Sequence, residues 1–245
     1  MVPALEEILA ATKSMVFFGG AGVSTESGIP DFRSVDGLYH QKFKYPPETM
    51  LSHTFYETHT AEFFDFYRQK LIVHGAKPNA AHLRLAALER EGKCKAVVTQ
   101  NIDGLHQAAG SKTVYELHGS TLRNYCTRCG KFFPVQFIED AAGVGDGVPR
   151  CDECGGIVKP DVVLYEEGLD EETMENAVHA IRGADTLIVG GTSLAVYPAA
   201  GLLRYFRGEN LVVINKQPTP ADAMANLLIH EPIGRTLDPN DNVEA

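Results

Sequence analysis

The feature that most constrains the fold is a set of short apolar runs, each followed at once by glycine or polar residues. The runs are rich in apolar and β-branched residues, as buried parallel strands tend to be, and they cover residues 15–18, 95–99, 113–117, 186–189 and 211–214. Helical patterns lie between them, notably at residues 79–91 and 171–182. This alternation predicts an α/β fold with a Rossmann-like, doubly wound parallel sheet.

Polar clusters follow the five runs. In chain order they read "GGAG" at 19–22, "QNID" at 100–103, "HGS" at 118–120, "GGTS" at 190–193 and "NK" at 215–216. Ligands of open α/β sheets bind outside the carboxyl ends of the strands, so we expect these clusters to share one cleft. The first cluster matches the phosphate-binding pattern G-x-G-x-x-G only in part, because Thr25 stands at the third glycine position.

Two stretches interrupt the alternation. Residues 39–76 are rich in aromatics at helical spacing, and residues 123–158 contain four cysteines and the glycine-rich segment "AAGVGDGVP". We expect a helical module at 39–76 and a zinc ribbon at 123–158, which together form a small domain. The large, discontinuous domain would then comprise residues 1–38, 77–122 and 159–245.

The cysteine spacing predicts a metal site. "CTRCG" and "CDECG" are two C-x2-C pairs with 21 residues between them, and each pair ends in a glycine that lets the backbone fold back. Four thiolates can enclose a zinc ion and leave it no open position, so the zinc should be structural. The ligands are Cys126, Cys129, Cys151 and Cys154. Reactive thiols are the alternative for such cysteines, and we expect Cys94 to be a core residue.

Composition narrows the possible partners. The net charge of −10 argues against a nucleic-acid partner, although a zinc ribbon could also serve as a nucleic-acid or protein-docking module. No segment approaches the roughly 18 apolar residues of a membrane span, and the first residues lack the pattern of a signal peptide. We therefore expect a cytoplasmic monomer with no membrane partner.

In their order along the chain, the motifs resemble the sirtuin family, the NAD-dependent protein deacylases of the silent-information-regulator type. The motifs are "GAGVSTESGIPDFRS", "TQNIDGLH", "ELHGS", the two C-x2-C pairs, "GTSLAVYPAA" and "VVINK". The resemblance implies that NAD is consumed, not reduced. The acyl oxygen of an acyl-lysine attacks the ribose carbon that carries nicotinamide, and water finally releases lysine and O-acyl-ADP-ribose.

The resemblance also implies roles for individual residues. Asp103 and the backbone of Ile102 would hold the nicotinamide carboxamide, Asn101 would position a ribose hydroxyl, and Phe32 would cover the sugar after nicotinamide leaves. The residues expected at NAD are Gly20, Ala21, Gly22, Ser24, Thr25, Asp31, Phe32, Arg33, Tyr39, Gln100, Asn101, Ile102, Asp103, His118, Gly191, Thr192, Ser193, Asn215, Lys216 and Ile233. Among them, the loop from Gly20 to Thr25 would present backbone N–H groups to the pyrophosphate at a helix N-terminus.

His118 fits the general base of this chemistry. An unperturbed imidazole has a pKa of roughly 6.5, so it is largely neutral near pH 7 and can take a proton from a ribose hydroxyl. The catalytic residues would be His118 and Asn101, whereas His106 is expected to be structural.

The substrate peptide is expected to add as a strand between the two domains. Its candidate contacts are Val163, Leu164, Tyr165, Glu166 and Val196, in the segments 162–167 and 194–197; a core strand and a loop are the alternative interpretation of these segments. Glu166 and Glu167 would favour a basic peptide. Relatives that prefer succinyl groups carry a tyrosine and an arginine where this chain has Phe64 and Tyr67, so acetyl or longer apolar acyl groups are expected, unless Arg68 supplies the charge.

Two other activities could use the same nucleotide fold. A dehydrogenase would produce reduced NAD and usually needs an acidic residue about 20 positions past the glycines, which only Asp36 and Glu48 approach. A mono-ADP-ribosyltransferase would cleave the same bond and add ADP-ribose to its target. A binding module without activity is the third alternative, and the filled catalytic positions disfavour it.

Overall fold

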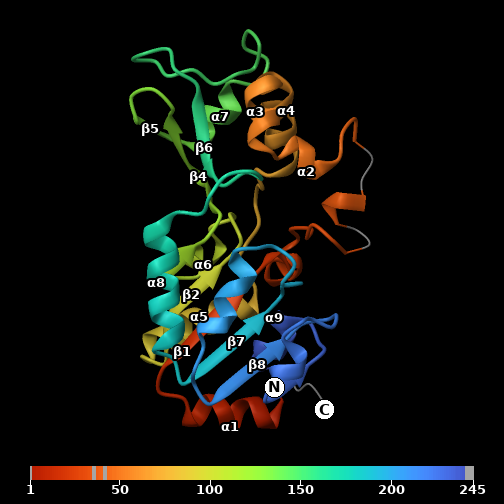
Figure 1. Cartoon of the computed structure of the whole chain (residues 1–245), viewed down its shortest axis with the longest axis vertical. Coiled ribbons are helices and arrows are strands. Elements are labelled where there is room, and N and C mark those ends of the chain that lie inside the picture. The colour runs from red at the N-terminus through yellow and green to blue at the C-terminus, as the bar shows by residue number, and fades with distance from the viewer. Residues whose placement is uncertain (1, 35–36, 41–42, 241–245) are drawn as a thin grey trace.

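The computed structural model describes residues 2–34, 37–40 and 43–240. A large sheet with its covering helices forms one end of the long axis, and a smaller sheet with its own helices forms the other (Figure 1). In the described part of the chain, no helix combines the length and the apolar character needed to cross a membrane.

The large sheet has six parallel strands in the order β3-β2-β1-β7-β8-β9. The five predicted runs form five of these strands, with ends that differ by one residue from those expected. The strands are β1 (Met15–Gly19), β2 (Cys94–Thr99), β3 (Val114–Glu116), β7 (Thr186–Gly190), β8 (Asn210–Ile214) and β9 (Leu227–Ile229). The strand order reverses at β1, because the chain passes to β2 on one side of it and later to β7 on the other.

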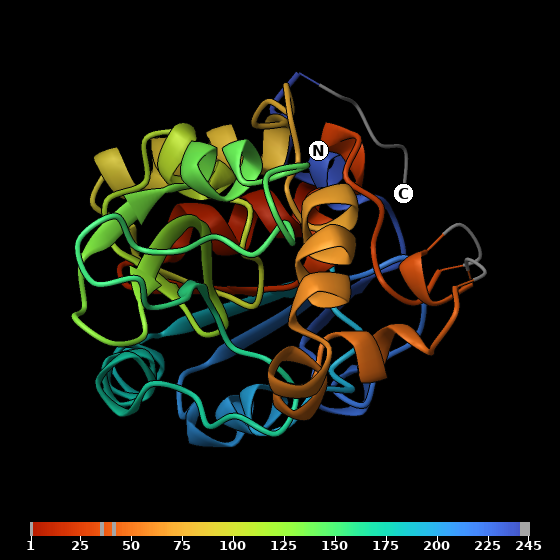
Figure 2. The same ribbon diagram turned by 90° about the horizontal axis from the view of Figure 1, so that it is seen from above.

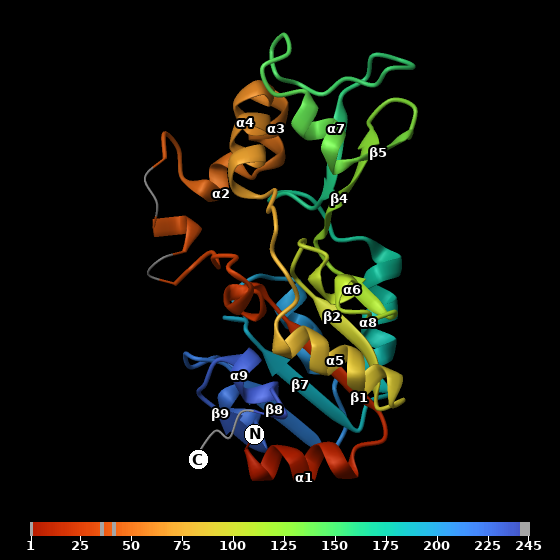
Figure 3. The ribbon, with the colours of Figure 1, turned by 180° about the vertical axis from the view of Figure 1, so that it is seen from behind.

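Side chains alternate along the strands and build a core on each face of the sheet. Val16 and Phe18 of β1 face α8 (Glu171–Arg182) and the 3-10 helix η4 (Ala199–Tyr205). Met15 and Phe17 face α1 (Pro3–Ala11), α5 (Ala80–Arg90) and α9 (Ile233–Leu237). The opposite views show this layering, with α8 in front of the sheet in Figure 1 and α5 in front of it in Figure 3. The predicted doubly wound fold is confirmed.

The small sheet is antiparallel, in the order β5-β4-β6. Its strands are β4 (Gly119–Cys126), β5 (Phe132–Pro134) and β6 (Val158–Val162), and α7 (Val135–Asp140) follows β5. The sheet extends past both expected edges of the zinc ribbon, because β4 begins at Gly119 and β6 ends at Val162. Backbone pairing of Gly119 with Val162 joins these two ends.

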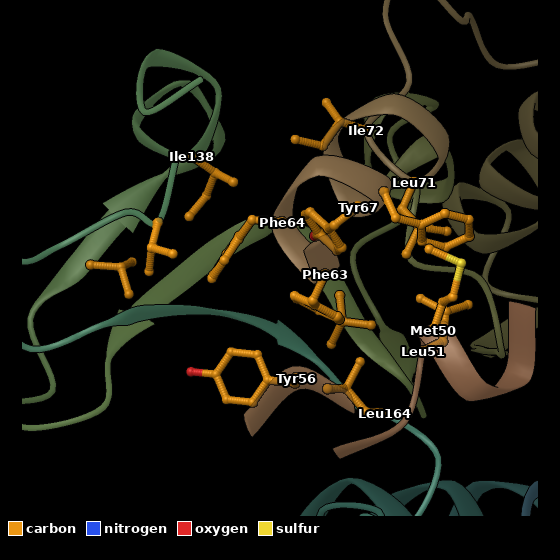
Figure 4. Packing of buried hydrophobic residues seen from close by; sticks show 14 of the residues in the cluster. Met50, Leu51, Tyr56, Phe63, Phe64, Tyr67, Leu71, Ile72, Ile138 and Leu164 are labelled. Carbon is orange, nitrogen blue, oxygen red and sulfur yellow. The ribbon is translucent and has the colours of Figure 1, made fainter. Parts of the chain in front are cut away.

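Helices α2 (Pro47–Met50), α3 (His53–Thr58) and α4 (Thr60–Lys70) pack beside the small sheet. The aromatic residues at helical spacing point inward and share one core with Ile138 of α7 and Leu164 after β6 (Figure 4). Phe63, Phe64 and Tyr67 are fully buried there. Seen from above, the orange helices and the green cysteine-containing segment lie next to each other (Figure 2).

The remaining elements are short. Helix α6 (Leu105–Ala108) follows β2, and the 3-10 helices η1 (Ala21–Val23), η2 (Thr25–Ser27), η3 (Leu38–His40) and η5 (Asp222–Met224) lie in connections. Of these, η1 and η2 form the loop after β1, at the point where the strand order reverses.

Candidate active site

The floor of the site is made of glycines at the carboxyl ends of β1 and β7. The N–H of Gly22 donates to the carbonyl of Gly191 at 2.8 Å. A Cβ on Gly22 would lie 2.8 Å from Cα of Gly191, and a Cβ on Gly191 would lie 2.4 Å from the nitrogen of Val23. The loop after β1 can therefore lie on the end of β7 only if both positions lack side chains. The strand order reverses here, and a doubly wound sheet binds its ligand at such a point, in a crevice outside the strand ends.

The glycine loop differs from the expectation in one respect. We expected a helix N-terminus, but the loop forms two consecutive 3-10 turns, η1 and η2, each of three residues. The N–H of Gly22 is bonded to Gly191 and the N–H of Ser24 to the carbonyl of Ala21, so neither is free for a phosphate. Gly20 adjoins Thr192, whose hydroxyl oxygen would lie 3.1 Å from a Cβ at that glycine, and the Thr25 hydroxyl donates to the Gly22 carbonyl at 3.0 Å.

A hydrogen-bonded chain of three side chains joins the loops after β1 and β2. The Asn101 amide donates to the Ser24 hydroxyl at 3.0 Å, and that hydroxyl donates to the Asp103 carboxylate at 2.6 Å. The second oxygen of Asp103 accepts from the N–H of Leu105 at 2.9 Å. The Ile102 carbonyl accepts from the N–H and the hydroxyl of Thr121, at 3.0 and 3.1 Å. These bonds fix the amide and the carboxylate in one orientation at the edge of the sheet.

His118 lies directly before β4 and is held by Gln100. Its Nδ1 is 3.0 Å from the Gln100 carbonyl oxygen, which can only accept, so Nδ1 carries the proton and Nε2 keeps its lone pair. Burial lowers the pKa of His118, and the hydrogen bond to the Gln100 carbonyl opposes that shift only in part. The ring is consequently neutral at pH 7 with an acceptor nitrogen, which is the state that a general base requires.

Gln100 also connects the site to the loop after β7. Its side-chain amide donates to the Thr192 hydroxyl at 3.0 Å, and that hydroxyl in turn accepts from the N–H of Leu194 at 3.2 Å. Ser193 between them is exposed. The predicted residues that follow β1, β2 and β7 are thus linked by hydrogen bonds, and His118 joins them through Gln100.

The loop after η2 folds back on itself. The Asp31 side chain accepts from the N–H groups of Arg33 and Ser34 at 3.0 and 2.7 Å. The Phe32 ring packs edge-on against Tyr39, with centroids 5.7 Å apart, and the Arg33 guanidinium lies 5.2 Å from the centre of the Tyr39 ring. The hydroxyls of Tyr39 and Tyr165 are hydrogen-bonded, which ties this loop to the small part of the molecule.

On the other side of the crevice, the site is bounded by the ends of β8 and β9 and by α9. The N–H of Asn215 donates to the carbonyl of Ile229, the side chain of Asn215 donates to Gln217 at 2.7 Å, and Lys216 is exposed. Ile233 is buried against Gly190, where a Cβ would lie only 2.2 Å from its Cδ1 atom. This side therefore offers the positive charge of Lys216, and Ile233 supports the end of β7 from behind.

The expected peptide segment is already paired on one edge. The N–H of Tyr165 donates to Leu51 at 3.0 Å, and its carbonyl accepts from His53 at 2.9 Å. The N–H of Val163 donates to His118, and Leu164 is buried. A peptide strand would therefore have to pair with positions other than Tyr165. A cavity of about 460 Å³ is lined by Tyr165 and Glu166 together with residues of α2 and α3.

The carboxylates in this segment are engaged within the protein. Glu166 accepts from the N–H and hydroxyl of Thr54 at 2.8 and 2.7 Å, while its backbone has a positive φ of 78°. Glu167 binds Lys159 at 3.1 Å and His53 at 2.8 Å. Burial opposes ionisation of Glu167, but the Leu164 N–H, His53 and Lys159 hold its pKa below the usual range. Val196, in the second expected segment, lies in an irregular loop after Leu194, whose φ is 53°.

The four predicted metal ligands converge. All four sulfur atoms lie within 4.8 Å of one another, with Cys126 and Cys154 3.3 Å apart and Cys129 and Cys151 3.7 Å apart. A zinc tetrahedron with Zn–S bonds of about 2.3 Å has edges of about 3.8 Å, so the cluster fits zinc and is too open for disulfides. The glycine after each pair has a left-handed backbone, with φ of 73° at Gly130 and 70° at Gly155.

The metal cluster is remote from the crevice. Cys126 is the last residue of β4, whereas His118 directly precedes its first, and an eight-residue strand spans roughly 25 Å. With four thiolates as ligands, the zinc has no open position, so the site is structural.

Cys94 is the remaining cysteine. It is buried at the start of β2, and burial raises the pKa of its thiol to about 12. It is a core residue, as expected, and it is not a nucleophile at neutral pH.

Sequence reasoning missed one part of the site. Glu26, in the glycine loop, accepts hydrogen bonds from Gly234 and Arg235 at the start of α9. Glu26 and Gly234 are 208 residues apart, and no local pattern in the sequence indicates that they are in contact. Helix α9 itself was not predicted.

Comparison with known proteins assigns the family. The model of the Sir2 family matches residues 20–198. Proteins named NAD-dependent protein deacetylase are similar over nearly their whole length: the Clostridium acetobutylicum protein is 62% identical, covering 96% of this chain and 95% of that protein, and the Clostridium perfringens protein is 59% identical, covering 95% of each.

Solved structures agree. A histidine-to-alanine variant of Sir2 with a deacetylated p53 peptide and 3'-O-acetyl ADP ribose superimposes with a TM-score of 0.88 at 38% identity, covering 96% of this chain and 94% of that one. A Sir2 complex with a p53 peptide and NAD+ gives a TM-score of 0.85 at 38% identity, covering 97% and 95%. Because the family model matches well over half of the chain and relatives are about 60% identical over nearly all of it, the chain belongs to the Sir2 family.

Proposed function

We propose that this chain is an NAD-dependent protein-lysine deacetylase that converts acetyl-lysine, NAD and water into lysine, nicotinamide and O-acetyl-ADP-ribose. The observation that carries the proposal is the arrangement of His118, whose proton is fixed on Nδ1 by the Gln100 carbonyl so that Nε2 can accept a proton. High identity to proteins of that name supports the same activity.

The crevice is chemically suited to NAD. Glycines leave room where the strand order reverses, and the hydroxyls of Thr192 and Ser193 can donate to ribose or phosphate oxygens. The Thr25 oxygen can accept from a ribose hydroxyl, and the buried Ile233 side chain packs behind this edge on Gly190. NAD supplies a ribose carbon that accepts the acyl oxygen when nicotinamide departs.

The protein's own groups act on orientation and proton transfer. Asn101 and Asp103, joined through Ser24, would hold a ribose hydroxyl and the nicotinamide carboxamide in fixed positions, which lowers the entropy cost of reaching the transition state. The lone pair on His118 Nε2 would accept the proton from a ribose hydroxyl. The Phe32 and Tyr39 rings would shield the sugar from water.

We also propose the domain division set out above, with edges moved to the ends of the small sheet. Its small domain comprises the helical module at 39–76 and the ribbon from Gly119 to Val162, and the zinc ion holds the ribbon together. The shared core of α3, α4 and β6 supports treating these two segments as one unit.

The proposed acyl preference is for acetyl and longer apolar groups. Phe64 and Tyr67 are fully buried in an apolar cluster. Arg68, the alternative carboxylate partner, instead donates to the carbonyls of Gly147 and Ile138 at 2.9 and 3.3 Å. A succinyl carboxylate would therefore enter this region without a cation to receive it.

The substrate would be an acetylated protein that binds near residues 163–166 and Val196. The enzyme would act in the cytoplasm, as a monomer, and would not bind nucleic acid. The net charge of −10 and four thiolates suited to a reducing compartment support this setting.

Mass spectrometry after incubation with NAD and an acetylated peptide tests the function. We expect loss of the acetyl mass, with nicotinamide and O-acetyl-ADP-ribose as products. An ADP-ribose adduct on the peptide would identify a transferase, and formation of reduced NAD would identify a dehydrogenase. Either result without deacetylation would refute the proposal.

A further inference from the structure

Glu26 joins two distant parts of the NAD crevice. One of its carboxylate oxygens accepts from the N–H of Gly234 at 2.6 Å, and the other accepts from the N–H of Arg235 at 3.2 Å. The residue before the helix, Pro232, provides no side-chain cap, so Glu26 caps α9 from η2. A Cβ on Gly234 would lie 2.6 Å from a carboxylate oxygen of Glu26, which means that the carboxylate occupies the space left by that glycine.

Helix α9 packs a buried apolar side chain behind the site. Its first residue, Ile233, packs on Gly190 at the end of β7. The same helix buries Leu237 against the core beside α5. A helix of five residues is far too short to be stable alone, so its position depends on such contacts.

The capped helix and the glycine loop meet at the same strand end. Gly22 of η1 is bonded to Gly191, and Ile233 of α9 lies on Gly190, so Glu26 of η2 completes a closed set of contacts among the glycine loop, the end of β7 and α9. Asn101 and Asp103 follow β2, on the other side of β1 from β7. The Glu26 contact therefore stabilises the half of the crevice that lies away from the nicotinamide end.

We propose that Glu26 is a positioning residue for the adenosine end of NAD. By holding α9 against the glycine loop, its carboxylate keeps the packing of Ile233 on Gly190, and with it the end of β7, in register with that loop. The proposal rests on the deacetylase function and adds a residue that contacts neither the reacting atoms nor nicotinamide. Its effect should fall on affinity for the adenosine part and not on the chemical step.

Glu26→Ala tests this by binding and kinetics on the zinc-loaded protein. We expect the Kd for ADP-ribose, measured by calorimetry, to rise about tenfold, because loss of a helix cap lowers the population of the binding-competent position of α9. The KM for NAD should rise in parallel, while kcat, the KM for acetylated peptide and inhibition by nicotinamide stay near wild type. Glu26→Gln keeps one acceptor oxygen and should recover part of the affinity.

Glu89→Ala is the matched control. The Glu89 carboxylate also accepts from two backbone N–H groups, those of Lys112 and Thr113, both at 2.8 Å, but it does so at the amino end of β3 and away from the crevice. The Glu89→Ala substitution should lower the melting temperature of the protein without changing its affinity for ADP-ribose. Equal ADP-ribose losses in the two variants, or a matching loss of nicotinamide inhibition in Glu26→Ala, would refute the positioning role.

The wild-type protein separates the two proposals. If it binds ADP-ribose but does not deacetylate, the function proposed above is wrong, and the Glu26 variants still test the positioning role by binding alone. If Glu26→Ala binds ADP-ribose as wild type does while the wild type deacetylates, only the role of Glu26 is wrong.

Discussion

At the scale of single residues, the chemistry of the site depends on backbone carbonyls as much as on side chains. The Gln100 carbonyl sets the tautomer of His118, and the Gln100 side chain reaches Thr192 across β1. The imidazole is neutral because burial lowers its pKa, and it is oriented because one nitrogen is already bonded.

Replacing this imidazole should stop catalysis and leave the fold intact. We expect His118→Ala to lower kcat by about 10²- to 10⁴-fold, which is the usual contribution of a general base. Deacetylation of a labelled peptide measures the loss. His179→Ala, on the exposed face of α8, should have no effect. If His118→Ala turned over substrate as fast as the wild type, His118 would not be the general base.

The pH profile should report the same group. A base must be unprotonated, and the pKa of His118 is lowered, so kcat/KM should fall only as the pH drops through a value below the usual imidazole value of about 6.5. Initial rates between pH 5 and 8, roughly the range in which histidine titrates, would show this. An acid limb above the usual value would contradict the burial argument.

The residue types at the site were predictable because each stands directly after a strand. The hydrogen bonds between them were not, because Asn101 to Ser24 and Glu26 to Gly234 join positions far apart in the sequence. The N–H of Gly22, expected to face the ligand, is instead used to bind Gly191, a contact that depends on how closely two strand ends approach.

At the scale of elements, strands were easier to predict than short helices. A buried parallel strand is continuous in apolar residues, so β1, β2, β7 and β8 are visible in the sequence. β9 has three residues and α9 has five, too few for a period to appear. The two 3-10 turns after β1 replace the expected helix for the same reason: segments of three residues carry no periodic signal.

Helices α5 and α6 bury a pair of histidines that should make stability depend on pH. The rings of His82 and His106 are 4.7 Å apart. Burial lowers the pKa of His82 to about 4, against the influence of Asp103, and that of His106 to about 3, with a further contribution from His82. Below about pH 6.5 these two histidines bind protons in the unfolded chain but stay neutral in the folded protein. The free energy of unfolding therefore falls as the pH falls.

His106→Phe tests the pair. From pH 7 to pH 5, the wild type should lose about 2 kcal/mol more of its unfolding free energy than the variant, because one proton is linked at about 1.4 kcal/mol per pH unit. Guanidinium titrations at the two pH values measure this. His179→Ala should follow the wild type. An unchanged pH slope in His106→Phe would show that the ring is not neutral by burial.

Helix α4 should determine the acyl preference. Because Arg68 is bonded to carbonyls and Phe64 and Tyr67 are buried, an unpaired succinyl carboxylate would be costly to desolvate. We expect kcat/KM for an acetylated peptide to exceed that for its succinylated counterpart by about 100-fold or more, which corresponds to roughly 3 kcal/mol. Parallel assays on one peptide sequence give the ratio, and faster desuccinylation would reverse the conclusion.

At the scale of the whole molecule, the two sheets are joined next to His118. Arg123 of β4 binds Glu116 of β3 at 2.7 Å and Asp161 of β6 at 2.8 Å, so one guanidinium links the large sheet to the small one. Strand β4 then runs from Gly119, beside His118, to Cys126 at the metal cluster. The presence of a small domain was predictable from the interrupted alternation, but this cross-link was not, since its three residues lie on separate strands.

Removing zinc should loosen the small sheet and spare the large one. With a chelator, we expect faster amide exchange in β4, β5 and β6 and loss of deacetylation, because the geometry of residue 118 depends on the start of β4. Strands β1, β7 and β8 should stay protected. Hydrogen-exchange mass spectrometry measures both regions, and added zinc should restore the wild-type pattern. Unchanged exchange in β4 after metal removal would show that zinc does not stabilise the ribbon.

The contact between Gly22 and Gly191 limits how this protein could be engineered. A single methyl group at either position would collide with backbone, and backbone cannot rotate away as a side chain can. Libraries aimed at a different dinucleotide or a bulkier cofactor analogue should therefore leave both positions unchanged and diversify the rim, at exposed residues such as Ser193 and Lys216. A change in ligand preference must therefore come from residues at the rim of the site, because the glycine floor tolerates no side chain.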